Sequence, residues 1–448
     1  MAQLNYQDSL KYLYGLTESG IKLGLENTSL LLKYLGDPQL KIRTIHIAGT
    51  NGKGSTAAMI HSILCAAGYR VGLYTSPHLS DFRERIQMNG TPIEEEELVA
   101  LVDRVREVSE KLKIPVTYFE FATVMAFLYF YEKNVDWGVI EVGLGGRLDA
   151  TNLCQADICI ISSIGLDHME HLGSDLKGIA GEKAAIIKRG SKVFTAVDNE
   201  DLLAVIREKT RNQNASLKCF GEDFRAVARS SGQRGQEIDF FIESRKLEKL
   251  FLPLIGRHQV TNAALALATC LELDSQNSQI SETAVRKGLQ ATFWPGRLEV
   301  ISESPTILLD CAHNPDGVQC LTQALRENFN FDRCIFVIGM MKDKPIEVML
   351  KIFSQIGDQF YLVKPNQPRS EDPKILRDLL AECQKPVEIV EEIPYALRLA
   401  RKNSGPHDII CISGSIFTVA EARRYFADEG ILKTDFGPLH PPGLGRSS

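Results

Sequence analysis

The sequence predicts an α/β protein: a parallel-sheet domain containing a P-loop, with appended antiparallel hairpins, followed by a smaller Rossmann-like α/β domain. Three observations carry this prediction. Short apolar runs alternate with helical segments, a glycine-rich loop joins a strand to a helix near residue 50, and a second alternating series follows a Pro-Gly break near residue 295. A chain of 448 residues exceeds the usual size of one core, so two domains are expected.

The first series begins with a strand at 44–48 ("TIHIA"), followed by a loop, a helix from Ser55 to about Ala67 that Gly68 ends, and a strand at 71–76. Between 218 and 256 the segments become polar, alternating and glycine-broken, which is typical of antiparallel hairpins. An alanine-rich helix is expected at 261–273. Further apolar runs of strand length lie at 137–142, 158–163 and 192–197.

The second series begins after "ATFWPGR", where Pro295 and Gly296 interrupt the periodicity. We therefore expect one domain over 1–295 and a second over 296–430. The Pro/Gly-rich end predicts a flexible tail over 431–448. Strands of the second domain are expected at 306–310, 334–340, 359–365, 387–391 and 408–414.

Composition narrows the class of protein. The net charge of −6 and the absence of a basic run give no reason to expect nucleic acid or an anionic membrane as a partner. The longest apolar stretch, 121–131, is too short to span a bilayer, and the first residues do not look like a signal peptide. We expect a cytoplasmic protein whose ten cysteines, which form no C-x-x-C pair, are reduced.

The loop "AGTNGKGST" at 48–56 is the strongest local signal. It differs from the usual G-x-x-x-x-G-K-[ST] spacing because Gly54 separates Lys53 from Ser55. A strand before it and a helix after it would direct backbone N–H groups and the helix dipole at one point, where Lys53 could reach the terminal phosphates of a nucleotide. The alternative is a glycine-rich turn without function.

A second motif, "VIEVGLGGRLDATN" at 139–152, places Glu141 at the carboxyl end of a strand. A carboxylate there suits Mg²⁺ beside phosphates, although it could also simply pair with a neighbouring base. The glycines lead into "RLDATN" and not into an apolar helix, which disfavours a dinucleotide-binding fingerprint.

Other polar groups also follow strands. His168 and His171 in "GLDHMEHLG" could share one helix face and bind a cation, but taken alone the pair is better explained as solvated or helix-capping histidines. Ser76 in "TSPHL" would by itself be a turn residue. Lys53, Ser76, Glu141 and His168 all come just after strand ends, so one sheet edge would collect them.

Three further segments are less decisive alone. Lys183 in "AGEKAAIIKRG" has the pattern of a solvated helix lysine. In the second domain, "DCAHNPDG" places Asp310 and His313 between a strand and a helix, where helix capping is an alternative function, and "WPGR" contributes Arg297.

Together, these motifs resemble the folylpolyglutamate synthase/dihydrofolate synthase family of Mur-type ATP-dependent ligases. The resemblance runs from about Gly20 to Arg424 and includes the family's glycine between the loop lysine and serine. It is carried by "GTNGKGS", "TSPHL", "EVGLGGRLDATN", "LDHMEHLG", "EKAAIIKRG", "WPGRLE", "DCAHNPDG" and "ISGSI".

The resemblance implies a role for each residue of the site. Ser76 and Glu141 would hold one Mg²⁺ and His168 a second. Lys183 would be carbamylated and bridge toward the metal, which removes an ammonium charge that Mg²⁺ would repel. Ser415 would line the interdomain cleft and Asp149 would lie near the incoming amino acid. The nucleotide would be bound by Gly49, Thr50, Asn51, Gly52, Lys53, Gly54, Ser55, Asn262, Arg297, Asp310, His313 and Asn314.

The implied reaction is phosphoryl transfer from ATP to a pterin-linked carboxylate, followed by attack of the L-glutamate amine on the acyl phosphate. Lys53, Lys183, His313, Asp310 and Asp149 are the implied catalytic residues. Dihydropteroate and tetrahydrofolate or its derivatives are the expected acceptors, used by a monomer that has both activities. "GIKLGLEN" at 20–27 would belong to the pterin side.

Two alternatives stay open. A UDP-muramyl amino-acid ligase uses similar chemistry but usually carries an N-terminal UDP-binding domain, and here only about 45 residues precede the loop. A P-loop nucleotide switch would bind partners without ligating anything.

Overall fold

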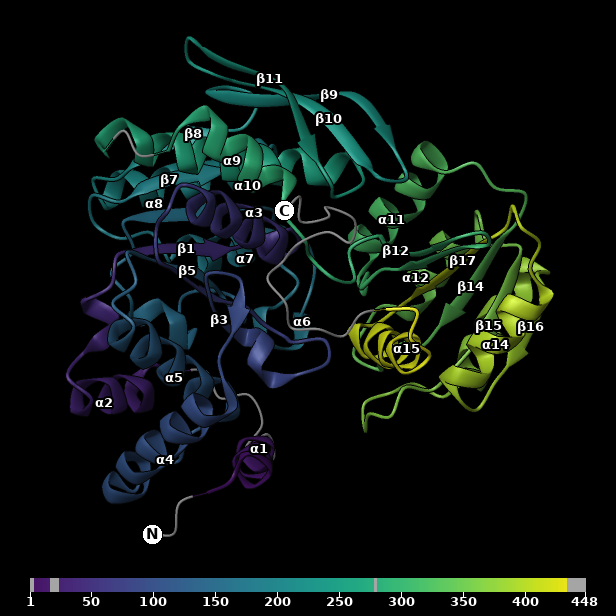
Figure 1. Cartoon of the computed structure of the whole chain (residues 1–448), viewed down its shortest axis with the longest axis horizontal. Coiled ribbons are helices and arrows are strands. Elements are labelled where there is room, and N and C mark those ends of the chain that lie inside the picture. The colour runs from purple at the N-terminus through teal and green to yellow at the C-terminus, as the bar shows by residue number, and fades with distance from the viewer. Residues whose placement is uncertain (1–3, 17–23, 278–279, 433–448) are drawn as a thin grey trace, which may run out of the picture.

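The computed structural model describes residues 4–16, 24–277 and 280–432. Figure 1 shows two α/β units side by side, with a small antiparallel sheet standing beyond the first. The predicted fold class is confirmed. Of the tail expected at 431–448, residues 433–448 lie outside the described residues, as do residues 20–23 of "GIKLGLEN".

The first unit is built on an eight-stranded sheet of order β4-β3-β2-β5-β1-β6-β7-β8. Strands β2, β5, β1, β6, β7 and β8 are parallel, whereas β3 and β4 are antiparallel additions at one edge. The strands are β1 (Thr44–Ala48), β2 (Val71–Tyr74), β3 (Ile86–Met88), β4 (Thr91–Pro92), β5 (Trp137–Glu141), β6 (Ile158–Ile161), β7 (Lys192–Thr195) and β8 (Ser216–Cys219).

Two hydrophobic cores cover the faces of this sheet. On one face pack α3 (Lys53–Ala66), α9 (Arg257–Asn277) and α10 (Glu282–Gln290). The other face is covered by α1 (Tyr6–Gly15), α2 (Glu26–Tyr34), α4 (Glu95–Leu112), α5 (Tyr118–Glu132), α7 (Leu176–Ala184) and α8 (Glu200–Asn212). Short helical segments are η2 (Pro38–Leu40), η3 (Phe82–Arg85), η4 (Ala150–Leu153) and α6 (Met169–Leu172).

The apolar stretch at 121–131 lies within α5, which is apolar on every side because it is buried in the core. A capping box between Thr117 and Glu120 fixes its start. In the described part of the chain, no helix combines the length and apolarity needed to cross a bilayer.

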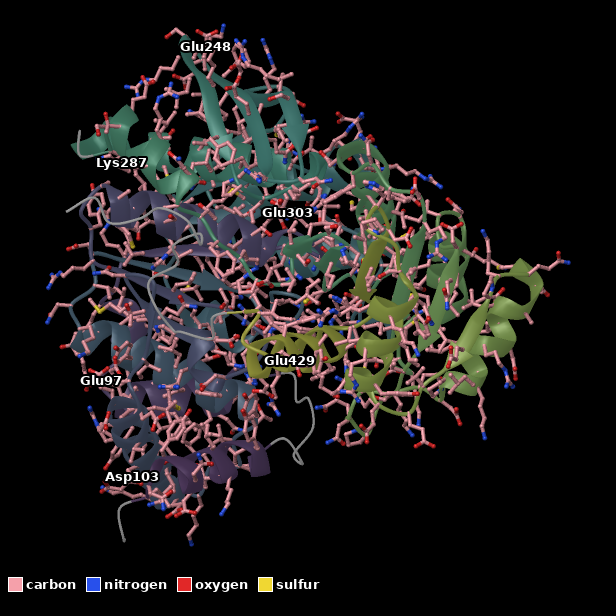
Figure 2. The ribbon with its side chains drawn as sticks, turned by 45° about the vertical axis from the view of Figure 1, so that its right-hand side comes forward. Glu97, Asp103, Glu248, Lys287, Glu303 and Glu429 are labelled. Atoms are coloured by element: carbon pink, nitrogen blue, oxygen red, sulfur yellow. The ribbon has the colours of Figure 1, made fainter. Side chains whose placement is uncertain are left out.

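The expected hairpins form a three-stranded antiparallel sheet of β9 (Phe224–Gly232), β10 (Gly235–Ile242) and β11 (Arg245–Leu252). It packs on α9, which begins at Arg257, four residues before the expected start. Figure 2 places the charged side chain of Glu248 at the outer end of this sheet and those of Glu97 and Asp103 at the opposite end of the molecule.

The second unit has a six-stranded sheet of order β12-β13-β17-β14-β15-β16, parallel except for β12. Its strands are β12 (Glu299–Glu303), β13 (Thr306–Leu309), β14 (Cys334–Ile338), β15 (Gln359–Leu362), β16 (Val387–Ile389) and β17 (Ile409–Ser413). One face holds α11 (Pro315–Asn328), α12 (Ile346–Ser354), α13 (Pro373–Leu380) and η5 (Ala381–Cys383); the other holds α14 (Ile393–Asn403) and α15 (Ile416–Asp428).

Every strand that the sequence predicts is present, and most end one to three residues before the predicted end. After β2, β6 and β13 the residues beyond the strand are polar and leave the ladder to enter the loops that follow. All ten cysteines are free thiols, as expected.

Candidate active site

The loop after β1 requires glycine at two positions. Gly49 and Gly52 have φ of 154° and 88°. A Cβ on Gly49 would lie 1.9 Å from Ser162 Oγ, and one on Gly52 would lie 2.4 Å from Asn262 Oδ1. The loop is fixed to the segment after β6 because Thr50 N and Asn51 N donate to the carbonyl and hydroxyl oxygens of Ser163, at 2.8 and 2.9 Å. Asn262 of α9, which is 6% exposed, therefore lies against the loop.

Lys53 is the first residue of α3, and its side chain folds over the loop. Its Nζ donates to the carbonyl oxygens of Gly49 and Thr50, at 3.0 and 3.2 Å. Among the described residues no side chain caps the start of α3, so the N–H groups of its first turn, which includes the buried Ser55, are available to an anion. This arrangement fits nucleotide phosphates.

Gly54, the residue that breaks the usual loop spacing, lies against the indole of Trp294. A Cβ on Gly54 would be 2.9 Å from Trp294 Cζ2, closer than van der Waals contact. Trp294 belongs to the "ATFWPGR" segment that leads into the second unit. The glycine thus lets the phosphate loop touch the connection between the two units.

This contact gives a first prediction. We expect Gly54→Ala to lower kcat/KM for ATP roughly 10-fold, because the added methyl must displace the indole ring. Steady-state ADP release at varied ATP measures the effect. In a Trp294→Phe background the same change should cost less, with a coupling of roughly 1 kcal/mol. Strictly additive effects would show that the two residues act separately.

Glu141 is the last residue of β5 and is buried, with 5% exposure. The Ser76 N–H, which follows neighbouring β2, donates to Glu141 Oε2 at 3.1 Å. Burial raises the pKa of Glu141, and the charge of Lys53 and the Ser76 amide oppose that rise. Within the described residues Glu141 makes no ion pair. A buried carboxylate without a cationic partner, beside a serine, fits a hard divalent cation.

His168 lies at the same edge, but not on a helix. It has φ of 51°, and α6 begins only at Met169. The expected shared helix face for His168 and His171 is therefore wrong, because the left-handed residue starts the turn. His168 is exposed, and its neighbour Asp167 is the residue that reaches the second unit.

Lys183 of α7 is buried, with 4% exposure, so the interpretation as a solvated helix lysine is wrong. Gly146 permits this burial: a Cβ there would lie 2.5 Å from the Glu182 carbonyl oxygen and 3.2 Å from Lys183 Cα. In the described structure Lys183 Nζ has no hydrogen-bond partner. Burial, and then the charge of Lys53, lower the pKa of Lys183 to about 7.

Asp149 shapes the loop that covers Lys183. It is 4% exposed and accepts from the N–H groups of Leu144 and Thr151, at 2.8 and 3.0 Å, and from the Thr151 hydroxyl. His46 Nε2 contacts the same hydroxyl at 2.8 Å, and because that hydroxyl donates to Asp149, His46 is the donor. Burial raises the pKa of Asp149, which the hydrogen bonds oppose.

From the second unit, Asp310 accepts from the N–H groups of Leu298 and Ala312, both at 2.9 Å, and so ties the Arg297 segment to the end of β13. Burial raises the pKa of Asp310, whereas the Arg297 guanidinium lowers it. The charge of Arg297 also acts on Glu141. The charge of Arg297 therefore acts on carboxylates of both units.

The phosphate loop contacts the second unit directly. The side-chain amides of Asn51 and Asn314 exchange hydrogen bonds of 3.2 and 3.0 Å. Asn314, 1% exposed, also caps α11 by accepting from Gly317 N at 2.8 Å. Capping and contact with the loop are thus combined in one residue.

The residue pair at the centre of this contact is not predicted by the sequence pattern. Lys344 Nζ lies 2.6 Å from Asp167 Oδ1, and both side chains are about nine-tenths buried. Asp167 also receives Asn314 Nδ2 at 3.2 Å and lies 3.5 Å from His313 Nε2. Burial raises its pKa, but His313 and Lys344 outweigh this and hold the pKa well below the usual range. Both residues follow predicted strands, the one signal that could have found them.

His313 Nδ1 donates to the Cys311 carbonyl oxygen at 2.8 Å, which directs Nε2 to Asp167. Ser415 is 1% exposed and caps α15 by accepting from Thr418 N at 3.1 Å. The hydroxyl of Ser415 is thus already engaged within the second unit.

Comparison with known protein families gives matches in both units of the chain. The Mur ligase middle domain matches residues 47–270, and the Mur ligase glutamate ligase domain matches 296–416. A dihydrofolate synthase/folylpolyglutamate synthase of Bacillus subtilis is 38% identical over 94% of this chain and 98% of its own. The chain belongs to the folylpolyglutamate synthase/dihydrofolate synthase family of Mur-type ligases.

Two further members of this family are also similar to this chain over most of its length. A folylpolyglutamate synthase of Lacticaseibacillus casei is 34% identical over 94% of this chain and 98% of its own. The solved structure of Escherichia coli FolC in complex with DHPP and ADP superposes with a TM-score of 0.88, at 32% identity over 96% of this chain and 100% of that one.

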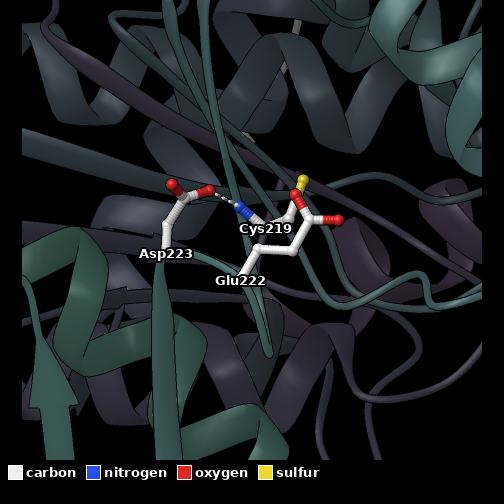
Figure 3. A group of neighbouring side chains, drawn as sticks. All are labelled: Cys219, Glu222 and Asp223. Carbon is white, nitrogen blue, oxygen red and sulfur yellow. Dashed lines mark hydrogen bonds between the residues drawn. The ribbon is translucent and has the colours of Figure 1, made fainter.

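One group outside the family's site resembles a metal site in composition: Cys219, Glu222 and Asp223 (Figure 3). Asp223 accepts from Cys219 N at 2.7 Å, and Glu222 pairs with Arg207 at 2.7 Å. These contacts close a turn after β8. Burial raises the pKa of the Cys219 thiol to about 11, which disfavours the thiolate that a metal needs.

Proposed function

We propose that this protein is an ATP-dependent ligase that activates a pterin-linked carboxylate as an acyl phosphate and joins it to the amine of L-glutamate, releasing ADP and phosphate. The observation that carries the proposal is the convergence of Lys53, Glu141 and buried Lys183 in one electrostatic group, since Lys53 perturbs the pKa of both others. A nucleotide switch has no need for a buried lysine with a lowered pKa beside its phosphate loop.

In this proposal the phosphate loop, from Gly49 to Ser55, binds the ATP phosphates through its N–H groups, and Lys53 neutralises charge on the transferring phosphoryl group. Glu141 and Ser76 would hold one Mg²⁺ and His168 a second. The metal would supply further neutralisation of phosphate charge. A carbamate on Lys183 would turn its repulsion from Lys53 into attraction.

The second domain, which we divide from the first at 295/296, completes the site. We propose that Arg297, Asp310, His313 and Asn314 meet the nucleotide, with Asn262 and Ser415 supporting its binding. The contacts of Asn314 with Asn51 and Asp167 would hold the domains closed. Closure excludes water, which would otherwise hydrolyse the acyl phosphate. Asp149 would orient the loop near the incoming amino acid, and the enzyme would act as a monomer.

We further propose that one site serves both acceptors, dihydropteroate and tetrahydrofolate or its derivatives. The relative named for both activities supports this proposal, whereas the relative named for polyglutamylation alone does not.

The deciding measurement is ADP release with each acceptor, with and without L-glutamate, at saturating ATP. We expect glutamate-dependent release with both. Release with tetrahydrofolate alone would remove the dihydrofolate synthase activity from the proposal. ADP release that does not depend on L-glutamate would favour a nucleotide switch. ADP release only with a UDP-muramyl acceptor would favour the cell-wall ligase.

A further inference from the structure

Arg85, the last residue of η3, carries a buried cation. The residue is only 7% exposed. Its Nε donates to His78 Nδ1 at 2.7 Å, and in the described chain no carboxylate lies within ion-pair distance of its guanidinium. Arg83, two residues before it, shows the contrast, because it pairs with Asp81 at 3.0 Å and Glu95 at 3.5 Å. A buried guanidinium without a carboxylate is unusual, since desolvating a charge is costly.

The groups around Arg85 are also donors without acceptors. Its Cζ lies 5.1 Å from the centre of the Tyr118 ring, and within the described residues no acceptor lies within hydrogen-bond distance of the buried Tyr118 hydroxyl. His78 accepts through Nδ1, so its remaining hydrogen is on Nε2.

The position of this cluster relates it to the reaction. The Arg85 carbonyl oxygen accepts from Thr75 N at 3.1 Å, directly before Ser76, and β3 then pairs with β2. The charge of Arg85 acts on Glu141, as that of Lys53 does. The cluster therefore lies in the first domain, beside the edge where the acceptor carboxylate would be phosphorylated.

We propose that Arg85, with Tyr118 and His78, binds a second carboxylate of the acceptor, the α-carboxylate of a folate's terminal glutamate. This inference rests on the proposed function. The carboxylate that attacks ATP must lie beside Lys53, so the one held by Arg85 is a different group. A guanidinium fork with a phenol and an imidazole N–H matches a carboxylate's acceptor sites. Dihydropteroate has only one carboxylate, so Arg85 is a specificity residue for glutamylated acceptors.

The test compares Arg85→Gln with Arg83→Gln, the matched arginine on the same short helix. We expect Arg85→Gln to raise KM for tetrahydrofolate roughly 10-fold or more, the scale of one charge-assisted hydrogen bond. KM for dihydropteroate, ATP and L-glutamate should change less than about 3-fold by the same scale. Tyr118→Phe should raise KM for tetrahydrofolate alone, by a smaller factor. Arg83→Gln should leave the ratio of the two acceptor KM values unchanged.

Two readouts separate this inference from its alternatives. The Tm of Arg85→Gln should not fall, because an unpaired buried cation is removed, whereas a structural arginine would lower it. Binding of each acceptor in the presence of ADP, without L-glutamate, tests the cluster without turnover. Selective loss of tetrahydrofolate binding would support the inference even if glutamate-dependent turnover were absent. An equal loss for both acceptors, or a raised KM for L-glutamate instead, would overturn it.

Discussion

The Lys53→Ala variant is expected to lose ATP turnover and keep its fold. Lys53 Nζ makes its hydrogen bonds to two carbonyl oxygens of the loop, and these can be replaced by water. Little stability should be lost, because the lysine stem is only partly buried. For catalysis, the loss of the charge nearest the phosphates should reduce kcat by roughly 10³-fold. This is the upper end of the range for removing one preorganised electrostatic group.

Glutamate-dependent ADP release and the Tm, measured on the same preparation, check this expectation. Lys41→Ala is a suitable control, because Lys41 is an exposed lysine of the same domain whose Nζ lies over the Tyr131 ring. Near-normal turnover by Lys53→Ala would mean that the loop does not bind the phosphates. A large drop in Tm would mean that the lysine holds the loop together, and activity alone would then not be informative.

The parts of the site that the sequence predicts are those that local rules control. Lys53, Ser76 and Glu141 follow three strands that are neighbours in the sheet, and parallel strands end at one edge. The position of these residues therefore follows from the strand pattern alone. Gly49 and Gly52 were likewise expected, since only glycine tolerates their backbone conformations.

The parts that the sequence did not predict depend on tertiary contacts. Asp167 and Lys344 are separated by 177 residues, and no local pattern pairs them. The helix expected to carry His168 begins one residue later, because a left-handed residue is not visible in a hydrophobic pattern. The partner of Gly54 belongs to the segment before the second domain, and the spacing of the loop does not reveal it.

Lys183 is the clearest case in which packing decides chemistry. Its local sequence indicates a solvated lysine, yet the close approach of Gly146 buries it, and Lys53 adds a like charge. With a pKa of about 7, roughly half of the amines are neutral at neutral pH, compared with about one in 3,000 for a lysine at 10.5. Only a neutral amine can attack CO₂, so the lowered pKa supports the proposed carbamate on Lys183.

Replacing Lys183 by alanine should therefore lower kcat roughly 10²-fold or more, the scale of losing a preorganised electrostatic group. Lys177→Ala is the matched control, because Lys177 is on the same helix but is 58% exposed and paired with Asp201. The native enzyme incubated with ¹³C-bicarbonate should show one carbamate resonance that Lys183→Ala lacks and Lys177→Ala retains. An unmodified ammonium at Lys183 in a nucleotide-bound crystal structure, together with normal kcat in Lys183→Ala, would exclude the carbamate. A low kcat in Lys183→Ala, together with no carbamate resonance in the native enzyme, would mean that the unmodified lysine is the functional group. The free amine can donate or accept a proton, whereas only the carbamate adds a negative charge.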